Sequence, residues 1–246
     1  MKTLDAIFGQ GKKRHEKAER EYAHAEIEAL KVPFSRLVYK LKEDIDAGTY
    51  DMLIGDDASG RIPTMALRKV FANRMRATHP DITPDEDREA LKTYFVAGGR
   101  SRHEDQYEHM RSFFEKIAPE VRRRALVVTE YIQSGESIRR LGKLLDAEHI
   151  PFDIATISFG IDERDERSEE VRDFFRNHTI IAGIVTRNAG APLIYDRQDL
   201  AGVEKSVQPL NAHAVRYFEK NSQDFLAARG DISRLADEAL KENWNA

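Results

Sequence analysis

The stretch from Thr129 to Ser137 combines a carboxylate with a short run of small, polar residues. It reads Thr-Glu-Tyr-Ile-Gln-Ser-Gly-Glu-Ser and follows the apolar run 124–128. Small residues such as Ser134 and Gly135 let the backbone turn tightly, so that consecutive N–H groups and the start of a helix form an anion site. The carboxylate of Glu130 accepts hydrogen bonds from sugar hydroxyls. An anion site beside a diol acceptor is what a ribose 5-phosphate requires.

A second polar run lies earlier in the chain, at residues 56–61, after the apolar run 50–55. Its members are Asp56, Asp57, Ala58, Ser59, Gly60 and Arg61. Arginine binds phosphate oxygens with a planar fork of donors, and the two acids would hold a metal-bound water or orient the loop. The run is predicted to be a loop between a strand and a helix, with Pro63 at the start of that helix.

The later stretch resembles the phosphoribosyl-diphosphate signature of the type I phosphoribosyltransferases. That signature is an apolar strand, two adjacent acids, two usually apolar residues, and a small-residue loop with Thr-Gly or Ser-Gly. Thr129 and Glu130 stand at the acidic pair, so one acid is replaced by a hydroxyl. The residues that match the phosphate loop are Gln133, Ser134, Gly135, Glu136 and Ser137. Some members carry a catalytic acid where this chain has Gln133, so that role is not transferred.

The resemblance also implies a role for residues 56–61, because the family holds pyrophosphate in a loop at this place that often contains Arg-Gly or a similar pair. It implies a pentosyl transfer in nucleotide metabolism, in which ribose 5-phosphate joins a nitrogen nucleophile and pyrophosphate leaves. The transition state would be oxocarbenium-like. Glu130 would be the catalytic carboxylate, and Mg²⁺ would be held mainly by substrate oxygens. The expected partner is a small phosphosugar or nucleotide.

Other interpretations stay open for the same residues. A non-catalytic member of the fold that senses a nucleotide or phosphosugar is favoured by Thr129, Gln133 and Glu136. An ordinary strand-to-helix loop would need Ser137 only as a helix cap. Arg61 would then pair with a helix carboxylate.

Two further segments have expected roles within the resemblance. Residues 98–107 correspond to a mobile lid, where Arg100, Arg102 and His103 would supply charge on closure. Tyr195 is placed to stack on a base or to pack in the core. The spacing of His103 and His109 does not match a zinc motif on a helix face.

Hydrophobic periodicity predicts that strands alternate with helices through the middle of the chain. Expected strands are 50–55, 90–97, 124–129, 152–159 and 180–186, and expected helices are 64–76, 104–117, 137–149 and 171–175. This alternation predicts an α/β fold with a mainly parallel sheet and helices on both faces. Ligands of such sheets bind outside the carboxyl ends of the strands, where both polar runs are expected.

Helical patterns flank this predicted core. The first covers 12–46 and is expected to break at Pro33, and the second covers 211–244 and is expected to break at Gly230 and Asp231. The chain is therefore divided into an N-terminal helical extension (1–48), a phosphoribosyltransferase-like core (49–195) and a C-terminal helical extension (196–246). The extensions have two candidate roles, covering the site or forming a homo-oligomer interface.

The amino-acid composition limits the classes of protein and of functional site that remain. Of the 246 residues, 41% are hydrophobic and 33% are charged, and the net charge of -4 gives no global indication of nucleic-acid binding. The absence of cysteine excludes disulfides, thiolate zinc sites and a cysteine nucleophile. No apolar run resembles a secretory signal or a membrane span, so a soluble, cytoplasmic protein is expected.

Overall fold

A five-stranded parallel sheet forms the centre of the computed structural model. The structure describes residues 21–96, 104–161, 168–187, 200, 203–204, 216–217 and 223–244. The strands are β1 (Met52–Asp56), β2 (Lys92–Val96), β3 (Ala125–Ile132), β4 (Phe152–Ile161) and β5 (Ile180–Arg187), in the spatial order β2-β1-β3-β4-β5. All four pairings in this sheet are parallel, which confirms the predicted α/β class. A short antiparallel pair, β6 (Val203–Glu204) and β7 (Arg216–Tyr217), follows it in the chain.

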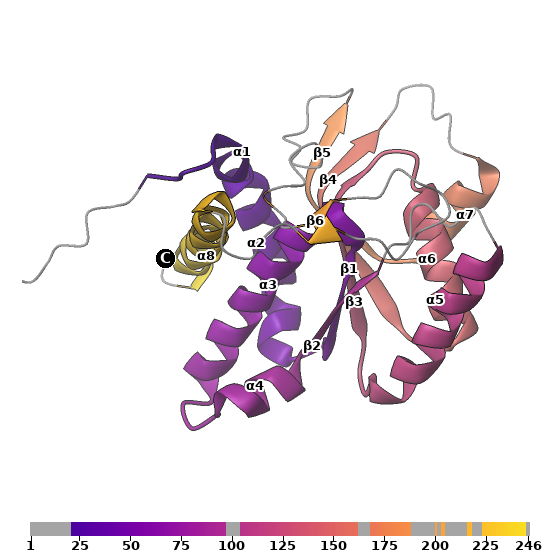
Figure 1. The fold of residues 1–246 in the computed structure, drawn as a ribbon, viewed down its shortest axis with the longest axis horizontal. Helices are drawn as coiled ribbons and strands as arrows, with labels where there is room; N and C mark the ends of the chain where they lie inside the picture. Colours follow the sequence, from indigo (N-terminus) through magenta and orange to yellow (C-terminus); the bar gives the residue numbers. More distant parts are fainter. Residues whose placement is uncertain are drawn as a thin grey trace, which may run out of the picture.

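Helices cover both faces of the sheet (Figure 1). On one side lie α1 (Ala25–Glu28), α2 (Lys31–Ala47), α3 (Asp57–Thr78) and α8 (Gln223–Trp244), with α4 (Pro84–Ala90) beyond the end of α3. On the other side lie α5 (Glu104–Ile117), followed by the short η1 (Ala118–Glu120), then α6 (Glu136–Ala147) and α7 (Glu169–Asn177). Successive side chains of a strand point to opposite faces of the sheet. Because helices cover both faces, the side chains on both faces of each central strand must be apolar.

Two apolar clusters show how the strands divide their side chains between these layers. Leu53 and Val128 belong to the cluster that contains residues of α1, α2, α3 and α8. Ile54 and Val127 belong to the cluster that contains residues of α5, α6 and α7. The helices near both ends of the chain therefore share one buried core with the sheet.

Two predicted loops at the carboxyl edge of the sheet are wrong in their boundaries. The expected loop at 130–136 is much shorter, because β3 runs on to Ile132 and α6 begins at Glu136. Pairing with the long strand β4 extends β3, with Tyr131 opposite Ser158 and Ile132 opposite Phe159. The expected loop at 56–63 is almost absent, because α3 begins at Asp57.

The flanking helices also differ from the prediction. Within the expected helical stretch 211–244, Arg216–Tyr217 form the strand β7, and α8 begins only at Gln223. Helix α8 runs unbroken through Gly230 and Asp231, so the expected break there is wrong. The Asp231 carboxylate accepts hydrogen bonds from the backbone N–H groups of Ala23 and His24, at 3.1 and 2.9 Å, instead of ending a helix. The expected break between two helices lies before Pro33, at Ala29 and Leu30, and Pro33 itself lies in the first turn of α2, where a missing N–H is tolerated.

Candidate functional site at the carboxyl edge of the sheet

The connections that follow β1 and β3 meet at the point where the strand order reverses. Strand β1 lies between β2 and β3, with Gly55 opposite both Phe95 and Val128. The chain leaves β1 for α3 on one face, and it leaves β3 for α6 on the other (Figure 1). Adjacent connections that diverge in this way form the crevice in which open parallel sheets bind ligands. The two predicted site segments therefore lie at one edge.

Thr129 and Glu130 are both buried, with 1% and 2% of their surface exposed. Glu130 lies on the face of Val128, towards α3, whereas Thr129 lies on the face of Val127, towards α5 and α6. The two positions of the acidic pair therefore project to opposite sides of β3. The backbone carbonyl of Glu130 accepts a hydrogen bond from Thr156 Oγ1 at 3.2 Å, which ties this end of β3 to β4.

The loop between β3 and α6 contains Gln133, Ser134 and Gly135. Gln133 and Ser134 are exposed. Gly135 is the N-cap of α6 and has a φ of 80° and a ψ of -4°, in the left-handed region that glycine adopts at little cost. Gly135 has no side chain to cap this helix, and the first-turn N–H of Glu136 donates to Ser134 Oγ at 3.4 Å. The positive dipole end of α6 faces the sheet edge. Ser137 lies inside the helix, so the alternative role proposed for it as the helix cap is wrong.

Gly135 has a packing role as well as a conformational one. An added Cβ would lie 2.4 Å from Cζ of Phe175 and 3.0 Å from Cγ1 of Val171. Both residues belong to α7, so this helix supports the loop from the side. The tight turn predicted at Gly135 is present, and the close approach of α7 is a second reason for glycine here.

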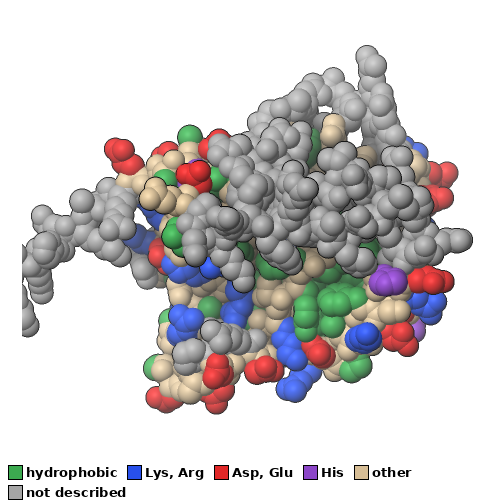
Figure 2. All heavy atoms as spheres, in the orientation of Figure 1, with side chains coloured by type: hydrophobic (Ala, Val, Ile, Leu, Met, Phe, Trp, Pro, Cys, Tyr) green, Lys and Arg blue, Asp and Glu red, His purple; other side chains and the backbone are tan. Residues whose placement is uncertain are grey.

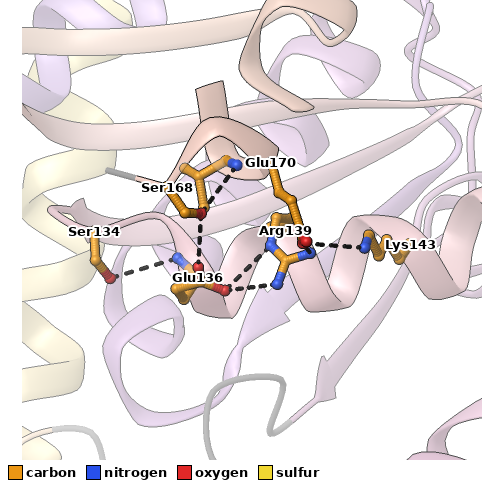
Figure 3. A network of polar contacts seen from close by, with 7 residues as sticks. Ser134, Glu136, Arg139, Lys143, Ser168 and Glu170 are labelled. Carbon is orange, nitrogen blue, oxygen red and sulfur yellow. Dashed lines mark hydrogen bonds and ion pairs between the residues drawn. The ribbon is translucent and has the colours of Figure 1, made fainter. Parts of the chain in front are cut away.

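Glu136 begins α6 and is the centre of a polar network (Figure 3). Its Oε2 accepts hydrogen bonds from Nε and Nη2 of Arg139 at 3.1 and 2.9 Å. Its Oε1 accepts one from Ser168 Oγ at 3.3 Å. Arg139 also donates to Glu170 at 2.6 Å, and Lys143 lies 3.7 Å from the same carboxylate. Burial raises the pKa of Glu136, but the hydrogen bonds from Arg139 outweigh it and the pKa is lowered.

The earlier segment is the start of α3 and not a loop. Asp56 ends β1 and is 7% exposed, and Asp57 and Ala58 are the first residues of the helix. Ser59 Oγ donates to the carbonyl of Asp56 at 2.9 Å. The next two residues each make a close contact with the sheet.

Gly60 lets α3 approach the sheet closely. An added Cβ would lie 2.4 Å from the carbonyl oxygen of Val128 and 3.0 Å from the carbonyl carbon of Gly55. The guanidinium of Arg61 lies 4.5 Å from the centroid of the Phe95 ring, a distance at which a cation is attracted to an aromatic face. Because α3 has no side-chain cap, a second helix N-terminus faces the same edge as that of α6.

Several other predicted residues are not placed by the structure. Arg100, Arg102, His103 and Tyr195 lie outside the described residues. His109 is exposed on α5. Within the described ranges there is no group of three or more His, Asp or Glu side chains that would hold a metal ion. In the same ranges, no helix is long and apolar enough to cross a membrane.

A cleft of about 770 Å³ lies at the opposite edge of the sheet. Its lining includes Tyr50 and Asp51 before β1, Lys92 at the start of β2, and Phe71 and Met75 of α3. In the corresponding lower part of Figure 2, Lys and Arg side chains are interspersed with Asp and Glu. The cleft is separated from the candidate site by the length of the strands, so the two are different places.

Sequence reasoning missed the contribution of α7 to the site. The spacing of Glu136 and Arg139 could have indicated their ion pair, since residues three apart on a helix are neighbours. No local pattern indicates that Ser168, Glu170 and Phe175 come to the same loop, because they follow a different strand. No protein-family model matches the sequence, and no match was found among curated proteins or solved structures.

Proposed function

We propose that the chain binds a ribose 5-phosphate group at the carboxyl edge of the sheet, with phosphoribosyl diphosphate as the ligand that fits best. One observation carries the proposal: the left-handed Gly135 opens helix α6 next to the strand end that holds the buried Glu130. An anion site and a carboxylate acceptor are thereby supplied by one strand–loop–helix unit. The resemblance to type I phosphoribosyltransferases rests on the same unit.

Each part of the ligand has a counterpart at this edge. The 5-phosphate would accept hydrogen bonds from the N–H groups at the start of α6 and from the hydroxyl of Ser134. The ribose hydroxyls would donate to Glu130. The pyrophosphate would lie at the N-terminus of α3, where Arg61 supplies a cation. This last assignment replaces the predicted pyrophosphate loop by a helix start, which suits an anion equally well.

Magnesium fits this arrangement through the substrate. Mg²⁺ is usually bound by one or two carboxylates together with phosphate oxygens, and the buried Asp56 at the end of β1 would supply one carboxylate. Glu130 lies on the opposite face of the sheet and would act on the ribose instead. The ion would neutralise charge on the leaving pyrophosphate. The protein's own part is to hold the phosphosugar and to keep the edge of the sheet preorganised.

The transfer, if the chain catalyses it, forms a bond between ribose C1 and a nitrogen atom. The bond from C1 to the pyrophosphate oxygen breaks, pyrophosphate keeps the electron pair, and the nitrogen passes its proton to the leaving pyrophosphate or to water. Positive charge on the ribose ring in the transition state would be stabilised by a nearby carboxylate, and Glu130 would supply it.

A non-catalytic sensor of a nucleotide or phosphosugar is the second candidate. It is favoured by Thr129, which is 1% exposed on β3 and stands where the family has its first acid. A hydroxyl can bind a sugar but supplies no charge to an oxocarbenium-like transition state. The same site would then bind its ligand without turning it over.

Calorimetry with phosphoribosyl diphosphate and Mg²⁺, followed by a pyrophosphate-release assay with a panel of bases, tests both candidates. Binding with release identifies a transferase, and binding without release identifies a sensor. A chain that binds neither phosphoribosyl diphosphate nor ribose 5-phosphate contradicts the proposal. Thr129→Asp is expected to raise turnover of a weakened enzyme and to give none in a sensor. Its unfolding must be followed in parallel, because the new carboxylate would be buried.

A further inference from the structure

Glu136 places a negative charge directly after the loop 133–135, which is proposed to bind phosphate. It is the first residue of α6, directly after Gly135. Two like charges a few ångströms apart near a protein surface repel each other appreciably. A free carboxylate here would therefore oppose the anion that the helix end attracts.

The structure shows how this carboxylate is held. Its Oε2 receives two hydrogen bonds from Arg139, at 3.1 and 2.9 Å, and its Oε1 receives one from Ser168. In Figure 3, Glu136 extends towards Arg139, one turn along α6, whereas Ser134 lies on the other side of the Glu136 backbone. Two charge-assisted hydrogen bonds from one guanidinium offset much of the charge of a carboxylate, and Lys143, 3.7 Å from Glu170, offsets the second carboxylate that Arg139 contacts.

Arg139 is itself held from α7. Its side chain is only 13% exposed and donates to Glu170 at 2.6 Å. The two carboxylates therefore fix the guanidinium between α6 and α7. Phe175 and Val171 of α7 pack against Gly135. Helix α7 therefore contacts the loop through apolar side chains and holds Arg139 through the Glu170 carboxylate.

We propose that Arg139 is a positioning residue that holds and neutralises the Glu136 carboxylate, and that this pair sets the affinity of the loop for phosphate. The inference rests on the proposed function, because it concerns the same anion site. Loss of Arg139 would leave an unneutralised carboxylate beside the loop. Loss of the charge on Glu136 would remove the repulsion altogether.

A double-mutant cycle tests the pair with inorganic phosphate and ribose 5-phosphate as probes, measured by calorimetry at low salt. Glu136→Gln is expected to bind both probes about two- to fivefold more tightly, and Arg139→Gln about three- to tenfold more weakly, as for one charge near an anion. The double variant should recover at least wild-type affinity, because no carboxylate remains to be neutralised. Rescue separates this role from a merely structural one, in which the double variant would bind as weakly as Arg139→Gln.

Arg176→Gln is the matched control, since Arg176 also pairs with an acid, Asp173, but on the exposed surface of α7. Its affinity for both probes should equal that of the wild type. Far-ultraviolet circular dichroism melts show whether each variant is folded at the temperature of the assay. If the wild type binds and neither single substitution changes its affinity, or the double variant is not rescued, the inference is wrong and the proposed function stands. If the wild type and all variants bind neither probe, both are wrong.

Discussion

Replacing Gly60 by alanine tests the close contact between α3 and the sheet. In most helix interiors this substitution stabilises a protein, because glycine costs about 0.5–1 kcal/mol relative to alanine. Here the new Cβ would lie 2.4 Å from the carbonyl oxygen of Val128, and 3.0 and 3.2 Å from two backbone atoms of Gly55. These are backbone atoms of two central strands, so they cannot rotate aside as a side chain would. Helix α3 must move away from the sheet instead.

Gly230 supplies a control with the same chemical change. It lies inside α8, is exposed, and has nothing within 4 Å of the position a Cβ would take. Gly230→Ala should therefore raise the free energy of unfolding by about 0.5–1 kcal/mol. Gly60→Ala should gain the same stability from helix propensity, but overpacking against the sheet should lower the free energy of unfolding by about 1–3 kcal/mol. The helix-propensity contribution cancels when the two variants are compared. Their free energies of unfolding should therefore differ by about 1–3 kcal/mol.

Urea unfolding followed by circular dichroism measures this difference, which for a chain of this size corresponds to about 2–4 °C in Tm per kcal/mol. The slope of the unfolding free energy against urea should be the same in both variants, so that only stability has changed. A Gly60→Ala protein as stable as Gly230→Ala would refute the close packing of α3 against the sheet. That result would also favour the predicted loop at residues 56–61 over a helix that begins at Asp57.

Four further predictions concern the site. Glu130→Gln should weaken ribose 5-phosphate binding about ten- to a hundredfold, since hydrogen bonds to a charged acceptor are worth about 1.5–3 kcal/mol; wild-type affinity in calorimetry would remove Glu130 from the ribose site. Arg61→Ala should weaken phosphoribosyl diphosphate more than ribose 5-phosphate, and equal losses in the same titrations would place Arg61 outside the pyrophosphate site. Gly135→Val should abolish phosphate binding and also lower the free energy of unfolding by about 1–3 kcal/mol, because of the positive φ and the contact with Phe175; unchanged stability in urea would contradict that packing. The lowered pKa of Glu136 adds stability that is present above its ordinary value of 4.5 and is lost as the pH falls through the folded-state value. The stability difference between wild type and Glu136→Gln should therefore shrink below about pH 4.5, and a difference that grows there would contradict the ion pair.

Local pattern was sufficient to predict the elements of the core. The apolar runs around Leu53 and Val127 predicted buried strands, and the helix at 104–117 has the predicted limits. The ends of strands were harder to predict where a polar residue interrupts the apolar run and the strand continues beyond it. For this reason the local pattern predicts a loop at Glu130, and pairing of β3 with β4 overrides that local signal. The start of α3 was misplaced because Pro63 is favoured at a helix start, yet the helix continues through it.

The sequence by itself determined that this chain forms alternating strands and helices, and that its two polar runs each follow a strand. Those features depend on side-chain periodicity and on turn residues such as Gly135, which act within a few residues of the chain. The tertiary structure decided which strands are neighbours, and hence that both runs lie at one edge of the sheet. It also decided that α7 supports the loop through Phe175 and Glu170. Contacts between segments joined only through packing leave no local pattern, because they depend on how helices fit against the faces of a completed sheet.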